Sequence, residues 1–135
     1  MLKIHRAKVA NDPTVPVWGT GRASRDFLHV DDCARASVLL MQDYNERDII
    51  NIGSGSEVTI AHLAAAIATV VGYSGQIEFD YSALEGVPRR VLDTTQLDTL
   101  GWKPAIDLLS GLETTYAWFV DHVSSVATST AVAHT

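Results

Sequence analysis

The chain has a single cysteine, Cys33, among its 135 residues. One thiol cannot form an intramolecular disulfide, and sparing use of cysteine is typical of a reducing compartment, so we expect a cytoplasmic protein. Cys33 falls in the first turn of an expected helix, where a thiolate would be stabilised. Its alanine neighbours on an apolar stripe instead favour a packed, unreactive side chain.

Metal-binding and nucleophile motifs are missing from the sequence. It contains no Cys-x-x-Cys, His-x-x-x-His or His-Glu-x-x-His spacing, so we expect no metal site. His29 lies beside Asp31 and Asp32, but a histidine in this setting more often supports a loop than binds a metal. No Gly-x-Ser-x-Gly nucleophile elbow occurs either.

Positive charge is scarce, because 10 Lys and Arg stand against 16 Asp and Glu, for a formal net charge of −6. Nucleic acids and anionic membranes attract basic surfaces, so neither is an expected partner. A long apolar run is also lacking. The most apolar stretch, residues 60–71, is too short to span a bilayer and is followed by Gly72, which predicts a buried helix.

Apolar periodicity and capping residues predict several helices. The first residues, LKIHRAK, resemble the last turns of a helix whose start is missing. The clearest helix covers residues 60–71, with Thr59 as its N-cap and Gly72 after its last turn. Further helices are expected at residues 32–42, from the N-cap Asp31; at residues 95–100, from Thr94; and from residue 108 onward, from Asp107.

Short strands are expected between these helices, at residues 15–18, 25–30, 48–52, 76–80 and 90–93. The Gly-Thr-Gly segment at residues 19–21 predicts a hairpin-like loop between the first two strands. Strands that alternate with helices indicate an α/β protein with a small sheet covered by helices.

Residues 48–80 imitate a dinucleotide-binding unit, with a strand, a Gly-Ser-Gly turn, a helix and a second strand that ends at Asp80. The fingerprint G-x-G-x-x-G requires a third glycine for close helix packing, and Val58 stands at that position. The helix also begins well after the glycines. We therefore expect a tight strand-to-helix turn here, and the rival hypothesis is a dinucleotide site at Gly53 and Gly55.

Arginine side chains are concentrated in two Gly/Pro-rich loops, and such loops carry function more often than regular elements do. One loop contributes Arg25 and the other contributes Arg89 and Arg90, whereas Arg6 and Arg22 are interpreted as solvated surface residues. A guanidinium group can hold a phosphate through two parallel donors. Trp18 offers a flat face to a sugar or a base. Together these residues predict a nucleotide-sugar ligand.

Several motifs resemble one family in order and spacing: LKIHRAK, VWGTGRASRDFLHVDD, INIGSGSEVTIAHLA, GVPRRVLD, LGWKP and GLETTYAWF. From Leu2 to about Phe119 the sequence resembles the GDP-L-fucose synthases, which are NADP-dependent epimerase/reductases of the extended short-chain dehydrogenase/reductase family. The resemblance implies a small C-terminal substrate-binding domain at residues 1–123, which starts within a helix and lacks a complete Rossmann fold. Residues 124–135 are expected to be a disordered tail.

The resemblance places the nucleotide-sugar contacts on Trp18, Arg25, Arg90 and Lys3. Arg25 matches the arginine that the family uses on the diphosphate, while Arg90 stands where well-known members have lysine. The family's catalytic Ser, its Tyr-x-x-x-Lys pair and its glycine-rich cofactor loop have no counterpart in this sequence. We therefore expect no catalytic and no cofactor-binding residue here: NADP would belong to the intact enzyme, and this chain would be inactive alone.

Three partners follow from this interpretation: a GDP-sugar, a missing N-terminal Rossmann half or a separate cofactor subunit, and further copies of the chain through exposed apolar surface. Two alternatives remain open. The chain is a standalone nucleotide-sugar-binding module, or it is part of another NDP-sugar epimerase or dehydratase.

Overall fold

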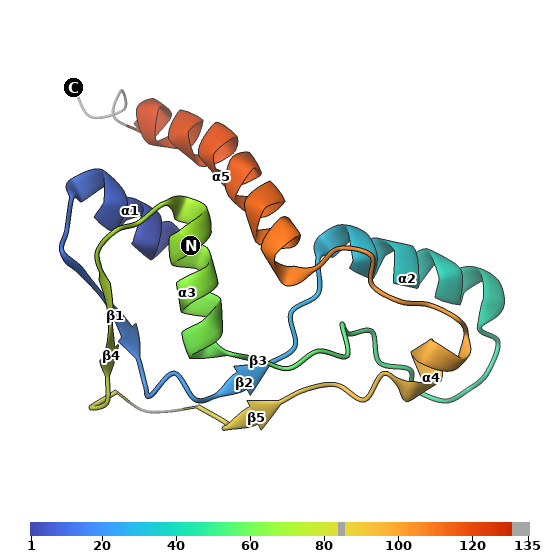
Figure 1. The fold of residues 1–135 in the computed structure, drawn as a ribbon. Coiled ribbons are helices and arrows are strands. Elements are labelled where there is room, and N and C mark those ends of the chain that lie inside the picture. Colours follow the sequence, from blue (N-terminus) through green and yellow to red (C-terminus); the bar gives the residue numbers. More distant parts are fainter. Residues whose placement is uncertain (84–85, 131–135) are drawn as a thin grey trace.

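The computed structural model describes the backbone of residues 1–83 and 86–130, with side chains as far as His122. Its central element is α3 (Ile60–Val71), which forms as predicted. The Thr59 hydroxyl accepts a hydrogen bond from the His62 backbone N–H at 3.1 Å, and Gly72 ends the helix with φ 70°. Figure 1 shows α1 (Leu2–Ala10) and α5 (Leu108–Thr130) beside α3.

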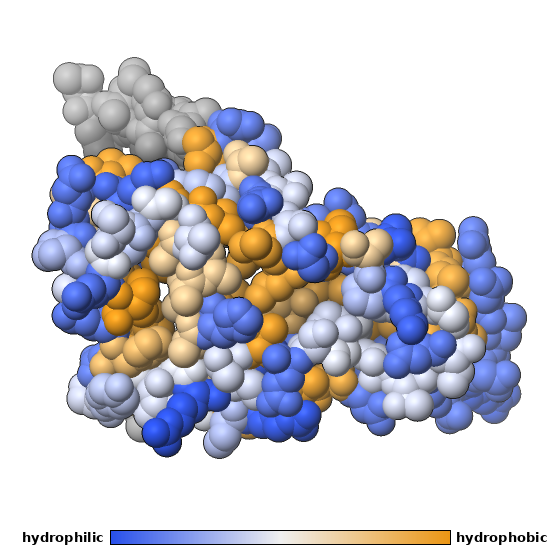
Figure 2. Space-filling view, viewed as in Figure 1, coloured by the Kyte–Doolittle hydropathy of each residue, from blue (hydrophilic) through white to orange (hydrophobic). Residues whose placement is uncertain are grey.

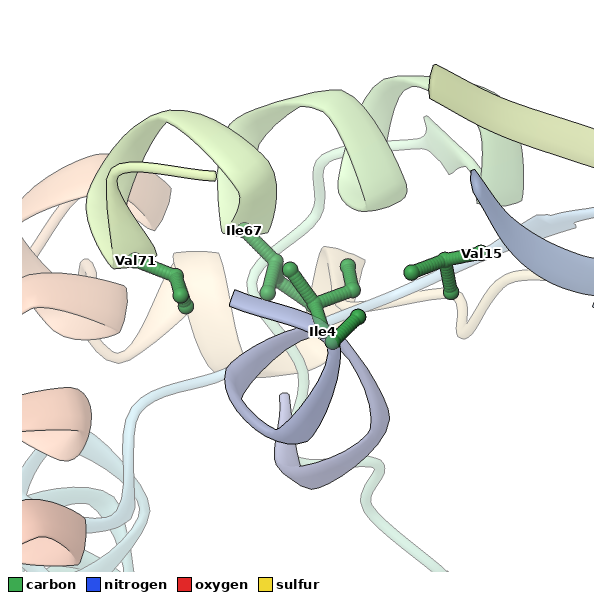
Figure 3. Close-up of a cluster of buried hydrophobic side chains, with 5 residues drawn as sticks. Ile4, Val15, Ile67 and Val71 are labelled. Atoms are coloured by element: carbon green, nitrogen blue, oxygen red, sulfur yellow. The ribbon is translucent and has the colours of Figure 1, made fainter. Parts of the chain in front are cut away.

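The first core lies where α1, α3 and β1 (Thr14–Trp18) meet. Ile4, Val15, Ile67 and Val71 point toward one another from these three elements (Figure 3). All are at least nine-tenths buried, and each such side chain contributes about 1.5–3 kcal/mol. Leu112 and Tyr116 of α5 pack against this core, as the periodicity of the last helix predicts.

The strands form two small sheets. β1 pairs in parallel with β4 (Gln76–Asp80), and a three-stranded sheet has the order β3-β2-β5. Its strands are β2 (Ser24–Arg25), β3 (Val58–Thr59) and β5 (Arg89–Arg90). The predicted hairpin between the first two strands is wrong. The chain after β1 does not fold back on it, because the Gly21 and Ala23 carbonyls accept the Ala61 and Ile60 N–H groups at the start of α3, and β1 pairs with β4 instead.

A second core lies between α2 (Val30–Asp43), α4 (Thr95–Thr99) and the segments that flank them. Its buried members are Ala36, Leu97 and Trp102. Between the two cores, Figure 2 shows apolar surface, and an open pocket of about 150 Å³, lined mainly by apolar residues, lies between Phe27, Leu63 and the start of α5.

The buried carboxylate of Asp32 connects α2 to the segment that leads into α5. It accepts hydrogen bonds from the backbone N–H groups of Ala105 at 3.0 Å and Ile106 at 2.9 Å, and from the Arg35 guanidinium. Burial raises the pKa of Asp32, but the hydrogen bonds from Arg35, Ile106 and Ala105 outweigh burial and hold this pKa below its ordinary value.

Two predictions about α2 are wrong. The helix begins two residues early, with His29 rather than Asp31 as its N-cap, and the His29 ring nitrogen accepts from the Asp31 N–H at 3.3 Å. Asp32 and Ala36 occupy the buried face, so Cys33 lies on the exposed side of the helix instead of packing.

The caps of the last two helices differ in how well they were predicted. Asp107 caps α5 as predicted. Thr94 is the N-cap of α4 but makes no side-chain hydrogen bond, and the Asp93 carboxylate accepts the Thr95 N–H instead.

Residues 48–52 do not form the predicted strand. Ile50 and Ile52 pack against the second core, while Ile49 between them is 92% exposed, so the alternation of a strand is present. None of the strands in the described ranges pairs with this segment, so it stays irregular.

Within the residues that the structure describes, no helix combines the length and apolarity that crossing a membrane requires. The predicted disordered tail stays a prediction, since α5 is assigned as far as Thr130 and residues 131–135 lie outside the described residues.

Candidate functional site

The three-stranded sheet places two arginines side by side. β2 and β5 run parallel, with Arg25 in register with Arg90 and Ser24 in register with Arg89. Neighbouring strands lie about 4.8 Å apart, and residues in register share a face while consecutive residues alternate. Arg25 and Arg90 therefore occupy one face of the sheet, which we call the arginine face, and Arg89 lies on the other.

The cations of the arginine face are available to a ligand. Arg25 is partly buried, and its Nη1 donates to the Ser24 carbonyl at 2.6 Å, whereas Arg90 is exposed. Among the acidic residues that the structure describes, none forms an ion pair with either guanidinium. Two adjacent positive charges without a carboxylate partner are suited to an anion such as a diphosphate.

The opposite face holds a hydrogen-bonded carboxylate, Glu57, that was not predicted from the sequence. Glu57, directly before β3, accepts a hydrogen bond from the Ser24 hydroxyl at 2.5 Å and from Arg89 Nε at 3.0 and 3.2 Å. The hydrogen bonds from Ser24 and Arg89 lower the pKa of Glu57. Arg89 is thus paired within the protein, whereas Arg90 has no ion-pair partner among the described residues.

The Gly-Ser-Gly turn at residues 53–55 is filled by a carboxylate of the chain itself. Asp26 accepts hydrogen bonds from the Ser54 N–H at 2.8 Å, the Ser54 hydroxyl at 2.5 Å and the Gly55 N–H at 3.4 Å. A Cβ at Gly53 would lie 2.5 Å from Asp26 Oδ2. The N–H groups that would hold a phosphate are occupied, which argues against the rival hypothesis of a dinucleotide site here.

One sequence signal could have found both carboxylates. Ser24 and Asp26 flank Arg25, so in a strand they share the face opposite to it. Polar side chains on that face require partners, and the Gly53–Glu57 segment supplies them.

Trp18 lies at the end of β1, in the other sheet, with its side chain 76% exposed. The chain from Trp18 to β2 is held in place because the Ala61 N–H bonds to the Gly21 carbonyl and the Ile60 N–H to the Ala23 carbonyl, each at 2.9 Å. Trp18 therefore offers a free indole face at the start of a fixed connection that leads directly to Arg25.

Lys3 is not brought against the arginine face by any contact of the described residues. Its ammonium group donates to the Pro16 carbonyl at 2.5 Å, from α1 onto β1. It also lines a groove of about 290 Å³ with Arg6, between α1 and β1. Lys3 thus lies beside the strand that carries Trp18, with one donor already engaged.

A larger hollow, of about 730 Å³, contains none of the predicted site residues. It lies where β1 and β4 begin, whereas Trp18 lies where β1 ends. Two of its polar side chains are engaged within the protein, since Lys8 donates to the Val71 carbonyl and the Tyr73 hydroxyl donates to the Asp12 carbonyl. Across the described ranges, no group of three His, Cys, Asp or Glu residues is arranged to hold a metal ion.

Comparison with known proteins matches the NAD dependent epimerase/dehydratase family to residues 1–53. The chain is 45% identical over 123 residues to GDP-L-fucose synthase 1 of Arabidopsis thaliana, which covers 91% of this chain and 38% of that protein. It is 44% identical over 131 residues to GDP-L-fucose synthase of Escherichia coli K12, with 90% and 41% covered. The chain thus spans about two-fifths of the length of these relatives.

Solved structures share the fold of this chain. The GDP-mannoheptose C4 reductase of Campylobacter jejuni, solved with NADP bound, is 32% identical, with a TM-score of 0.76 over 87% of this chain and 42% of that one. A GDP-L-fucose synthetase of Naegleria fowleri, at 22% identity, shares the fold with a TM-score of 0.84 over 91% of this chain and 39% of that one. The fold is therefore that of part of an extended short-chain dehydrogenase/reductase.

Proposed function

We propose that this chain, a homologue of GDP-L-fucose synthases over nine-tenths of its length, is the nucleotide-sugar-binding part of an NADP-dependent epimerase/reductase that makes GDP-L-fucose from GDP-4-keto-6-deoxymannose. Residues 1–123 form this substrate-binding part. The observation that supports the proposal most strongly is the arginine face, where Arg25 and Arg90 stand in register without a carboxylate partner among the described residues.

Each site residue has a distinct role in this proposal. Arg25 and Arg90 hold the two phosphates, since paired guanidinium groups match phosphate oxygens in geometry and charge. Trp18 covers the base or the sugar with its exposed indole face. Lys3 contributes least to binding, because its ammonium group already donates a hydrogen bond to the Pro16 carbonyl and would have to break this bond or use its other donors.

The chemistry itself lies outside this chain. None of its four tyrosines, at positions 44, 73, 81 and 116, has a lysine four residues later. The Gly-Ser-Gly turn at residues 53–55, the phosphate site of the rival hypothesis, does not fit NADP, because the Asp26 carboxylate already accepts its N–H groups. NADP, when bound by the rest of the enzyme, supplies the hydride; residues of this chain bind and orient the nucleotide-sugar. The proposed site of action is the cytoplasm.

A second candidate is part of another GDP-sugar reductase, and the similarity to a GDP-mannoheptose C4 reductase favours it. Both candidates predict the same diphosphate contacts. They differ in the sugar, so affinities for GDP-mannose and GDP-mannoheptose would separate them.

The proposal is tested by titration calorimetry of the 135-residue chain with GDP-mannose and, separately, with NADP. We expect micromolar binding of GDP-mannose, at least tenfold weaker in Arg25→Ala, because a hydrogen bond to a charged group contributes about 1.5–3 kcal/mol. Arg22→Ala, an exposed arginine in the same connection, is the matched control and should bind as the wild type does.

Two results would contradict the proposal. Wild-type chain that gives no heat with GDP-mannose lacks the nucleotide-sugar site. Oxidation of NADPH by the isolated chain with GDP-4-keto-6-deoxymannose would show that the chemistry is present after all.

A further inference from the structure

The consecutive arginines of β5 create an ambiguity of register. β5 has only two residues, Arg89 and Arg90, and both are exposed. A slip of one residue against β2 would exchange the faces of the strand and place Arg89 opposite Arg25. Because the two side chains are identical, the pairing of β5 with β2 does not by itself choose which arginine joins the arginine face.

The backbone holds β5 in its register only lightly. The Ser24 N–H bonds to the Pro88 carbonyl at 2.8 Å, and β5 pairs only with β2 within the described sheet. Register is weakly specified in strands that are polar on both faces, and β5 carries an arginine on each face. A side-chain contact that distinguishes Arg89 from Arg90 is therefore needed to define the site.

Glu57 supplies this contact. Its carboxylate accepts from Arg89 Nε with both oxygens, at 3.0 and 3.2 Å, and one oxygen also accepts from the buried Ser24 hydroxyl. Glu57 is thereby bound to the residue of β2 that lies in register with Arg89. In the slipped register, Pro88 would stand beside Ser24, and proline offers no donor to this carboxylate.

We propose that Glu57 is a positioning residue: by holding Arg89 on the far face of the sheet, it fixes the register of β5 and leaves Arg90 beside Arg25 for the ligand diphosphate. The inference rests on the proposed function for its ligand, but not for the register itself. Glu57 does not touch the ligand, and it acts through Arg89 and β5.

The first arm of the test measures register without any ligand. Nuclear Overhauser contacts between β2 and β5 in the isotope-labelled chain should form one set in the wild type, with residue 24 against residue 89. In Glu57→Ala a second set should appear, with residue 25 against residue 89. Glu113→Ala, which removes an exposed carboxylate from α5, is the control and should keep the single set.

The second arm measures GDP affinity in a double-mutant cycle. We expect Arg90→Ala to weaken GDP binding about tenfold in the wild type. In the Glu57→Ala background, Arg90→Ala should weaken GDP binding by less than about threefold, because Arg89 can then occupy the position beside Arg25. A purely structural role of Glu57 would instead give equal losses in both backgrounds.

The outcomes separate the two claims. A single, unchanged register in Glu57→Ala overturns the role of Glu57, whether or not GDP binds. A second register in a chain that binds no GDP supports the role of Glu57 and contradicts the proposed function. Should Glu57→Ala fail to fold, Glu57→Gln keeps an acceptor for Ser24, removes the charge that holds Arg89, and is expected to show the same second set of contacts.

Discussion

The buried carboxylate of Asp32 gives the sharpest prediction about stability. Its side chain is inaccessible to solvent, and its oxygens accept the N–H groups of Ala105 and Ile106 and a bond from Arg35. Asp32→Asn preserves the shape but turns an amide group toward these donors. At least one buried donor then loses its acceptor, and the remaining bonds lose the charge of the carboxylate.

The expected cost follows from these bonds. A buried donor without a partner costs about 1–3 kcal/mol, and a hydrogen bond to a charged acceptor contributes about 1.5–3 kcal/mol. We therefore expect Asp32→Asn to lower the free energy of unfolding by about 2–4 kcal/mol. For a domain with a total of about 5–15 kcal/mol, this loss is large and still leaves a folded chain to measure.

Urea denaturation followed by circular dichroism at pH 7 measures this loss, with Asp31→Asn as the control. Asp31 lies in the same helical turn but is 72% exposed, so Asp31→Asn removes only the interaction with the helix N-terminus, about 0.3–1 kcal/mol, and a surface contact with His29 at 3.7 Å. A loss in Asp32→Asn no greater than in Asp31→Asn, at equal urea dependence, would refute the reasoning.

The difference in unfolding free energy between wild type and Asp32→Asn should also depend on pH. The pKa of Asp32 in the folded chain lies below its ordinary value, near 3.9 in an unfolded chain. Its contribution is therefore fully present above the unfolded pKa and is lost as pH falls through the folded pKa. The difference between wild type and Asp32→Asn should stay constant between about pH 5 and 8 and shrink below about pH 4.

Two further predictions concern the loop before β2 and the surface of α2. Gly21→Ala should lower the free energy of unfolding, measured by urea denaturation, by about 1–3 kcal/mol more than Gly101→Ala does. Both glycines have positive φ (74° and 76°), but only a Cβ at Gly21 would meet the Phe79 ring, at 2.5 Å. Equal losses would contradict the expected clash. Light scattering should show that the isolated chain self-associates, because Val38 and Met41 of α2 are 46% and 79% exposed. Met41→Glu should shift the chain toward the monomer. A wild-type chain that stays monomeric at all concentrations would contradict this prediction.

Local signals predicted α3 completely because all of its determinants lie within the helix. Thr59 accepts the His62 N–H, the apolar stripe faces the first core, and Gly72 takes the left-handed conformation that ends the helix. The cap of α5 by Asp107 was predictable for the same reason.

Pairing between distant segments was not predictable in this way. Sequence spacing suggested a hairpin between the first two strands, but β1 pairs with β4, which lies beyond α3. The segment at residues 48–52 has the alternation of a strand and finds no partner among the described strands. Strand identity depends on which neighbours the fold supplies, and local sequence does not specify this.

The candidate site was likewise predictable only where its determinants are local in the sequence. Loop composition and family resemblance singled out Arg25 and Arg90, but only the register of β2 and β5 places them on one face. Asp26 and Glu57 escaped notice because their partners, Ser54 and Arg89, lie 28 and 32 residues away along the chain. Asp26 occupies the turn at residues 53–55 and Glu57 pairs with Arg89, so these carboxylates determine which turn and which cations are unavailable to a ligand.

The central claim, that the arginine face holds a diphosphate, is tested most directly by phosphorus NMR of GDP-mannose titrated with the chain. We predict that both phosphorus resonances shift on addition of the wild type, and that the shifts persist with Arg22→Ala and vanish with Arg25→Ala/Arg90→Ala. Resonances that do not move with folded wild-type chain, or that move equally with the double variant, would contradict the account.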